Sequence, residues 1–107
     1  MTRSWSSAKA QREMPACIAK AKRYGFMVHG ELVATCYLCD QPIDLALEPG
    51  KPGSKQIDHR VPQDEGGTDH QSNLFLTHFR CNRAKGTKPY EAARRAILAQ
   101  RRTSRIW

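Results

Sequence analysis

Two pairs of metal-ligating residues constrain this 107-residue chain more than any other feature. Cys36 and Cys39 form a Cys-x-x-Cys turn, and His78 and Cys81 repeat the same spacing farther along the chain. Each pair presents two ligands to one metal ion, and three thiolates with one imidazole complete the tetrahedral set that zinc prefers. Four protein ligands leave no open position on the metal, so this zinc is expected to be structural. In a domain this small, such a metal contributes much of the stability.

The use of cysteine also indicates the compartment. A Cys-x-x-Cys turn taken alone equally fits a redox site, but no thioredoxin-like βαβ pattern surrounds it. The remaining cysteine, Cys17, stands apart and is expected to be a small buried apolar residue. This spacing suits metal binding in a reducing compartment, and no apolar run has the length of a membrane span or a signal peptide. We therefore expect a cytoplasmic protein that does not engage a membrane.

The net charge of +8 is distributed unevenly along the chain. Residues 1–30 carry six basic side chains and one acidic one, residues 31–79 carry three and eight, and residues 80–107 carry nine and one. An acidic middle between two basic arms fits a metal site held between segments that grip phosphate. Charge alone equally fits basic termini that are merely solvated.

Local patterns predict a mixed α+β domain. Pro15 suits the first position of a helix that Gly25 would close in the left-handed conformation, and Gly86 would stop a later helix. Loose ends are expected at both termini. The expected elements are, in order, a helix over 15–23, a strand or extended segment over 26–34, strands over 56–59 and 73–77, a helix over 78–85 and a final helix over 90–102.

The dipeptide Asp58-His59 at the end of a predicted strand carries the candidate chemistry. Neighbours on a strand point to opposite faces unless the strand end is bent, so the two side chains are expected to have different chemical roles. A carboxylate suits a hard divalent cation, and a neutral imidazole suits proton abstraction from water. Taken alone, the dipeptide fits at least as well a salt-bridged surface Asp beside a buried His.

The dipeptide is one of five motifs that occur together in a fixed order. They are Cys-x-x-Cys, Asp-His-x-x-Pro, Gly-Gly, Asn-Leu, and a ligand pair closed by Cys-Asn and Lys85. In this order, over roughly residues 33–88, they resemble the HNH endonuclease family, whose shared element is the ββα-metal fold. The chain also resembles a bacteriophage branch of that family, often encoded beside DNA-packaging genes, in which the second knuckle reads His-x-x-Cys-Asn and Pro-Ile-Asp follows the first.

The resemblance implies a role for each matching residue. His59 would be the general base that activates water, and Asp58 and Asn82 would hold a catalytic Mg²⁺, Mn²⁺ or other divalent ion. Asn73 matches the central Asn of the motif, which braces the loop that orients His59. Asn82 stands where many members have His, a departure shared by other active members.

The resemblance also implies a substrate and a domain plan. The substrate would be DNA, and the candidate phosphate contacts are Arg60, Arg80, Arg83 and Lys85, each of which alternatively fits a solvated helix charge. The plan is a basic N-terminal arm and helix over 1–30, a zinc-stabilised nuclease core over 31–88, and a basic C-terminal helix and tail over 89–107.

The sequence is compatible with more than one partner and more than one function. The phage branch suggests the large subunit of a terminase as a partner. The alternative to an enzyme is a zinc-stabilised module that binds DNA or adapts a terminase without catalysis, and the sequence leaves target specificity and oligomeric state open.

Overall fold

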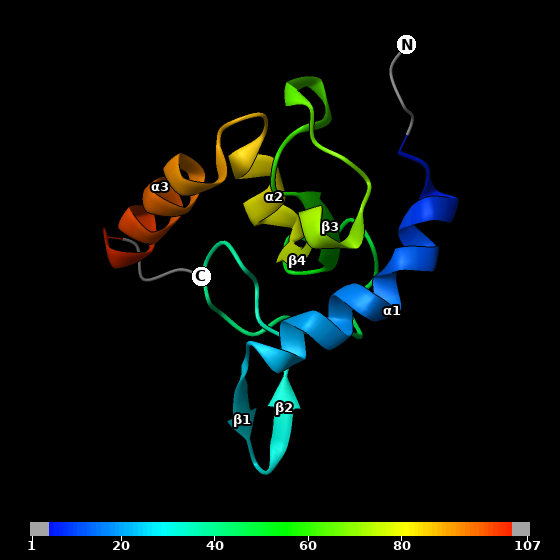
Figure 1. Cartoon of the computed structure of the whole chain (residues 1–107). Helices are drawn as coiled ribbons and strands as arrows, with labels where there is room; N and C mark the ends of the chain where they lie inside the picture. The colour runs from blue at the N-terminus through cyan, green and yellow to red at the C-terminus, as the bar shows by residue number, and fades with distance from the viewer. Residues whose placement is uncertain (1–4, 104–107) are drawn as a thin grey trace.

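A strand–strand–helix unit forms the centre of the molecule (Figure 1). The structure is a computed structural model that describes residues 5–103. Strand β3 (Lys55–His59) pairs antiparallel with β4 (Leu74–His78), with Ile57 opposite Leu76. β4 leads directly into helix α2 (Phe79–Lys85), which ends at Gly86 as predicted. The predicted α+β class with a ββα core is therefore confirmed.

Helix α1 (Ser7–Arg23) begins eight residues before the predicted start at Pro15, which lies inside it. The side chain of Ser6 accepts a hydrogen bond from the backbone N–H of Lys9 (3.2 Å) and caps the first turn. Pro15 removes one backbone hydrogen bond from the helix. The helix nevertheless continues through it, because packing of its apolar face against the core outweighs that loss. The apolar side chains that α1 lays against the core are Trp5 (just before the helix), Ala10, Met14, Ile18 and Ala21.

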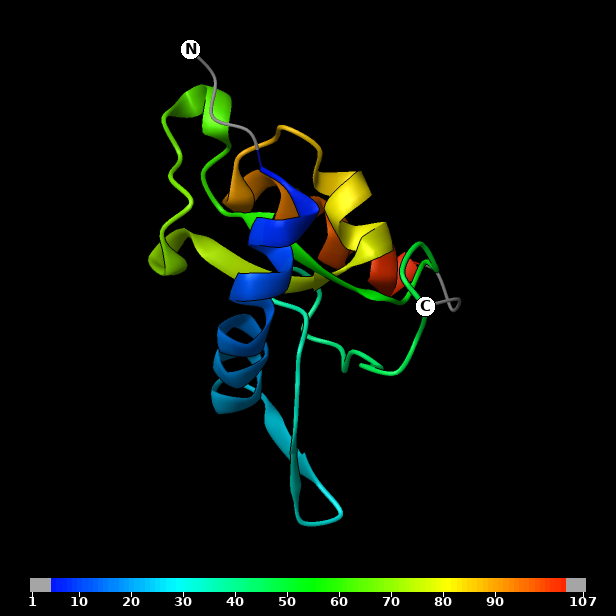
Figure 2. The same ribbon diagram turned by 90° about the vertical axis from the view of Figure 1, so that its right-hand side faces the viewer.

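A hairpin follows the helix and projects from the body of the molecule (Figure 2). It consists of β1 (Phe26–Val28) and β2 (Glu31–Val33), and its two turn residues both have positive φ. The segment 26–34, expected as a strand or an extended lead-in, is thus two strands. Gly25 is not left-handed as predicted. Glycine is required at this position for a different reason: a Cβ there would lie 2.1 Å from the carbonyl oxygen of Val33.

The core lies where α1, the β3–β4 sheet and the irregular segment before β3 meet. Leu38 from that segment and Leu74 and Leu76 from β4 are fully buried. Cys17 is also fully buried on the inner side of α1, which confirms that prediction. A single bridge between Thr35 and Pro42 closes the turn that carries the first cysteine pair.

Helix α3 (Tyr90–Thr103) packs against α2 and matches the predicted final helix to within one residue. Its buried side chains Ala93 and Ile97 join it to the rest of the domain. The loose ends expected at the extreme N-terminus and in the final Ser-Arg-Ile-Trp fall on residues outside the described range, 5–103. Among the described residues, no helix is long and apolar enough to cross a membrane.

The loop between β3 and β4 carries two short 3-10 turns, Gln63–Glu65 and Gln71–Asn73. Between them the chain passes very close to itself at Gly67, because a Cβ there would lie 1.7 Å from the carbonyl oxygen of Val61. No side chain fits in that space. The loop is therefore folded back on the end of β3, beside His59.

Replacement of Gly67 by Ala is expected to destabilise the domain by about 1–3 kcal/mol, because the added methyl group forces the loop away from β3. Thermal unfolding of the zinc-loaded protein measures this loss. Glu65→Ala, at an exposed position of the same loop, serves as the control. Equal melting temperatures for Gly67→Ala and the parent would show that the close approach is absent.

Candidate active site and metal centre

The four predicted zinc ligands come together in one buried cluster. Cys36 and Cys39 come from the turn before β3, His78 ends β4 and precedes α2, and Cys81 lies in the first turn of α2. All four side chains are buried, and their ligand atoms lie within 4.8 Å of one another. The ββα unit thus supplies one half of the cluster, and a segment far away in the sequence supplies the other.

The distances inside the cluster fit a tetrahedral metal. Nδ1 of His78 lies 3.3 Å from Sγ of Cys39 and 3.8 Å from Sγ of Cys81. Ligands at ordinary zinc bond lengths stand roughly 3.5–3.8 Å apart. Nε2–H of His78 donates to the carbonyl oxygen of Pro42 (2.9 Å), so Nδ1 is the ring nitrogen that faces the thiols and can bind the metal.

Electrostatics in the metal-free cluster favour one thiolate, at Cys36, while hydrogen bonds with Cys36 and Cys39 raise the pKa of the Cys81 thiol. Burial by itself raises the pKa of the Cys36 thiol, but hydrogen bonds from Cys39, Cys81 and His78 lower it far below its ordinary value. Thiolates are the form that binds zinc. The donor set, its burial and the fixed imidazole all fit a structural zinc ion.

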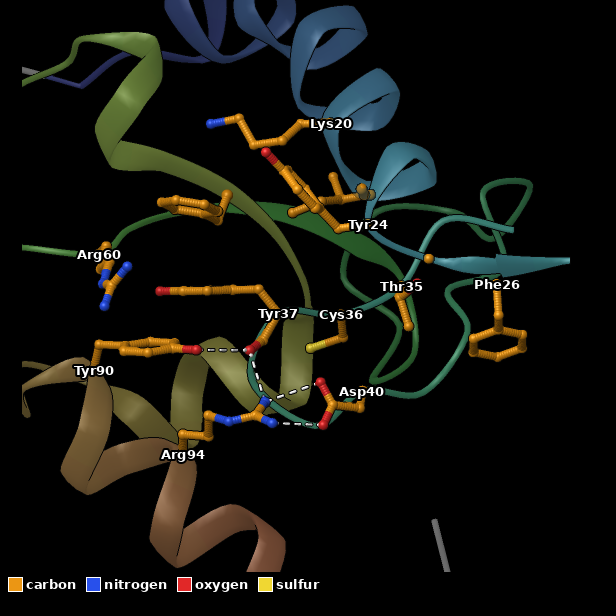
Figure 3. A pocket seen from close by; sticks show the side chains of 14 residues that line it. Lys20, Tyr24, Phe26, Thr35, Cys36, Tyr37, Asp40, Arg60, Tyr90 and Arg94 are labelled. Carbon is orange, nitrogen blue, oxygen red and sulfur yellow. Dashed lines mark hydrogen bonds and ion pairs between the residues drawn. The ribbon is translucent and has the colours of Figure 1, made fainter. Parts of the chain in front are cut away.

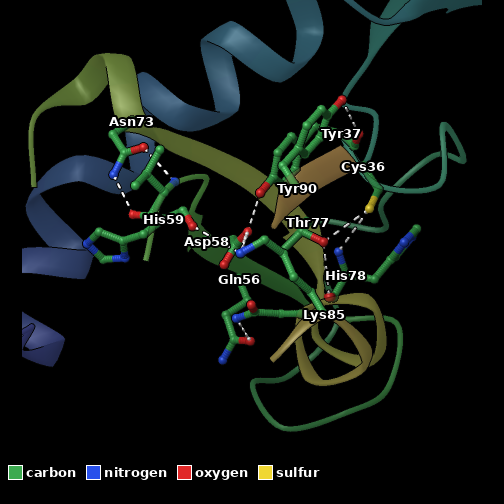
Figure 4. Close-up of polar contacts among 12 residues, drawn as sticks. Cys36, Tyr37, Gln56, Asp58, His59, Asn73, Thr77, His78, Lys85 and Tyr90 are labelled. Carbon is green, nitrogen blue, oxygen red and sulfur yellow. Dashed lines mark hydrogen bonds and ion pairs between the residues drawn. The ribbon is translucent and has the colours of Figure 1, made fainter. Parts of the chain in front are cut away.

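Asp58 is buried, and two donors contact the same carboxylate oxygen (Figure 4). The hydroxyl group of Tyr37 donates to Oδ2 of Asp58, and Nζ of Lys85 lies 3.3 Å from that oxygen. Burial raises the pKa of Asp58, while the Tyr37 hydrogen bond and the Lys85 charge act against that rise.

Lys85 was expected at the DNA surface, and this expectation is wrong. Its side chain is 1 % exposed, and its ammonium group also donates to the carbonyl oxygen of His59 (3.2 Å). The reason is that helix α2 turns this face toward β3, where the buried carboxylate of Asp58 needs a cation.

His59 leaves β3 on the opposite face from Asp58, as the alternation along a strand predicts. Its Nε2–H donates to Oδ1 of Asp69 (2.8 Å), and the Trp5 ring meets its imidazole edge to face at 4.6 Å. Lys9 of α1 pairs with the other oxygen of Asp69 at 3.3 Å. His59 therefore faces α1, and its side chain is only 12 % exposed.

Asp69 is held as a carboxylate. Its slight burial acts to raise its pKa, but hydrogen bonds from His59, Lys9 and Gln63 lower it. Because a carboxylate only accepts hydrogen bonds, the proton of the neutral imidazole lies on Nε2 of His59. Nδ1 is then the nitrogen with a free lone pair.

Asn73 joins the two ends of the loop that follows β3. Its Oδ1 accepts from the backbone N–H of Val61 (2.9 Å), and its Nδ2 donates to the carbonyl oxygens of Val61 (3.1 Å) and Thr68 (2.9 Å). The backbone N–H of Arg60 donates to the carbonyl oxygen of Asn73 (2.9 Å). These bonds fix the loop directly after His59.

Asn82 lies on α2, next to zinc ligand Cys81 but turned toward β3. Its Nδ2 donates to Oε1 of Gln56 (2.6 Å), which leaves the Asn82 amide oxygen facing away from Gln56. Gln56 and Asp58 are two apart on β3, so they share a face of that strand. The oxygen atoms of Asp58 and Asn82 are thus presented from neighbouring elements on one side of the sheet.

The other predicted phosphate contacts differ in exposure. Arg60 and Arg83 are exposed, with Arg60 lying over the Tyr90 ring at 4.3 Å and Arg83 over Phe79 at 5.6 Å. Arg80 is half-buried, and its backbone N–H donates to the carbonyl oxygen of Pro52.

Three contacts of this site were missed by sequence reasoning, namely those of Tyr37, Gln56 and Asp69. Tyr37 stands inside the Cys-x-x-Cys turn, which placed it near the zinc but gave no sign that β3 passes beneath it. Gln56 and Asp69 carry ordinary polar side chains, and only the fold brings them to Asn82 and His59.

Cys81→Ser is expected to abolish zinc binding and to lower the melting temperature sharply, because it removes one of four ligands on which folding depends. Zinc content by mass spectrometry and helicity by circular dichroism measure the two effects. Cys17→Ala, a buried cysteine outside the cluster, should keep its zinc. A Cys81→Ser protein with full zinc content and unchanged melting would contradict the assignment.

The comparisons with known proteins agree with this geometry. Residues 36–88 match the family model described as HNH endonuclease. Neither the comparison with curated proteins nor that with solved structures gives a significant match. The matched stretch begins at the first zinc ligand and includes the whole ββα unit. Residues 36–88 therefore form an HNH endonuclease domain, a phosphodiester hydrolase that acts on DNA.

Proposed function

We propose that the chain is a metal-dependent DNA endonuclease in which His59 is the general base and Asp58 and Asn82 bind the catalytic cation. The observation that supports the proposal is that all three residues lie on the ββα unit of an HNH domain. Asp58 and His59 end β3 on opposite faces, and Asn82 approaches from α2 on the Asp58 side.

The ligands proposed for the cation are both oxygen atoms, from the carboxylate of Asp58 and the amide of Asn82. Hard divalent ions such as Mg²⁺ and Mn²⁺ prefer oxygen ligands, so the donor set fits them. An ion bound there would stabilise negative charge on a scissile phosphate and on the leaving oxygen. Gln56 supports this role because it binds the amide nitrogen of Asn82 and leaves the amide oxygen free of that contact.

His59 is suited to accept a proton from the attacking water. Asp69 holds the imidazole by Nε2–H, so Nδ1 is the acceptor. The hydrogen bonds of Asn73 to the loop that continues from His59 support the bracing role proposed for it. The expected products carry a 5′ phosphate and a 3′ hydroxyl.

Basic side chains support contact with the DNA backbone. Arg60 and Arg83 are exposed, and the basic arms at 1–30 and 80–107 flank the acidic middle of the chain. Contacts of this kind fix position without reading sequence. The non-catalytic alternative predicts the same salt-dependent binding, but it gives no function to Asp58, His59 and Asn82.

We also propose that the activity serves phage DNA packaging together with a terminase large subunit. The support is the resemblance of the His-x-x-Cys-Asn knuckle and of Pro-Ile-Asp after the first cysteine pair to the packaging-associated branch. A terminase large subunit that neither co-purifies with this chain nor changes its cutting would remove this part of the proposal.

His59→Ala is expected to reduce nicking of supercoiled plasmid by about 10²- to 10⁴-fold in Mg²⁺ or Mn²⁺, because it removes the general base. Conversion of supercoiled to open-circular DNA on agarose gels measures the rate. His29→Asn is a matched control: it removes an exposed imidazole, and Asn tolerates the left-handed backbone at that turn.

The two functional classes give different results in this assay. Nicking that requires the metal, survives in His29→Asn and is lost in His59→Ala supports the nuclease. Equal cutting by His59→Ala and the parent would show that the base is misassigned. DNA binding by the zinc-loaded parent without any strand breaks would favour the non-catalytic module.

A further inference from the structure

The Tyr37 ring is clamped between two other aromatic rings. It stacks on Phe75 of β4 (centroids 4.8 Å apart, planes 16° apart) and on Tyr90 of α3 (5.0 Å, 10°). We name these three rings the aromatic clamp; they border a pocket of about 440 Å³ (Figure 3). Two stacking partners leave the ring little freedom to tilt or shift.

The backbone of Tyr37 is held as firmly as its ring. Its N–H donates to the carbonyl oxygen of Leu76 (3.2 Å), and its own carbonyl oxygen accepts from Arg94 (3.1 Å) and from the Tyr90 hydroxyl (3.5 Å). Arg94 is itself fixed by a two-bond contact with Asp40 at 2.9 and 2.6 Å. Figure 3 shows the Arg94 and Tyr90 groups converging on this carbonyl.

The Tyr37 hydroxyl ends at Asp58. Its O–H donates a hydrogen bond to Oδ2 of the buried Asp58 carboxylate. Lys85 approaches the same oxygen (Figure 4). Among the described residues, none donates a hydrogen bond to the other oxygen, Oδ1. Two donors on one oxygen fix the rotation of the carboxylate and leave Oδ1 as its available ligand atom.

We infer that Tyr37 is a positioning residue that aims Oδ1 of Asp58 at the catalytic cation. The inference rests on the proposed function, because it takes Asp58 as a ligand of that cation. Tyr37 contacts neither substrate nor metal in this arrangement; it acts through the carboxylate. Partners of this kind orient metal ligands in many sites.

The residues that hold Tyr37 in place extend beyond the HNH match at residues 36–88. Tyr90 and Arg94 belong to α3, outside that stretch, and both hold Tyr37. The zinc ligand Cys36 precedes Tyr37 in the chain and anchors it from the other side. Helix α3 and the structural zinc site thus both support the proposed cation site through one side chain.

Tyr37→Phe tests the inference, because it keeps the stacked ring and removes only the hydroxyl. We expect its Mn²⁺ affinity to fall about 10- to 100-fold, while its zinc content stays that of the parent. Loss of the free Mn²⁺ signal in electron paramagnetic resonance measures binding without any need for cleavage. Tyr24→Phe removes a hydroxyl from a tyrosine that is 77 % exposed and should bind Mn²⁺ like the parent.

A neighbouring pair of arginines tests the part played by α3. Arg94→Met removes the contact with the Tyr37 carbonyl and should weaken Mn²⁺ binding in the same direction. Arg95→Met removes the same charge from the next, exposed position and should leave binding unchanged. An equal effect of both variants would indicate general electrostatics and would contradict the role of the clamp.

Mn²⁺ binding by Asp58→Ala, compared with the parent, separates failure of the inference from failure of the proposed function. Asp58→Ala should lose the Mn²⁺ site that the parent shows. If the parent and Asp58→Ala bind Mn²⁺ alike, Asp58 is not a ligand, and both the proposed cation site and the inference fall. If Asp58→Ala loses binding but Tyr37→Phe keeps parental affinity and parental nicking, only the inference is overturned.

Discussion

The Cys3His cluster is the interaction on which the rest of the structure depends. It ties the turn at Cys36 and Cys39 to the junction of β4 and α2, two segments that share little other regular structure. The strands of the ββα unit are five residues each and its helix is seven, too few to build a large core. Metal binding is therefore part of folding, and it also places Tyr37 over β3.

A buried polar network lies beside that cluster and is unusual for so small a domain. Asp58 and Lys85 are both buried, and removing either one would leave an uncompensated charge in the interior. The Tyr37 hydroxyl donates to the same carboxylate oxygen that Lys85 approaches. Such an arrangement contributes little net stability compared with apolar packing, so its physical value lies in fixing the orientation of one carboxylate.

The two terminal helices reach the proposed site from opposite faces of β3. Trp5, just before α1, and Lys9 of α1 contact His59 and its partner Asp69, while Arg94 of α3 contacts the Cys-x-x-Cys turn that carries Tyr37. The HNH stretch supplies the side chains proposed to do the chemistry. The flanking helices supply the packing that fixes those side chains.

The sequence by itself determined the metal ligands, the ββα order and the ends of α2 and α3, because these depend on local spacing and on breakers such as Gly86. It misplaced the start of α1, because burial of an apolar face outweighed the cost of Pro15. Only the tertiary structure decided that Lys85 is buried, that Tyr37 binds Asp58 and that Asp69 binds His59. These contacts join residues far apart in the chain, and no local pattern encodes which polar side chains the folded backbone brings together.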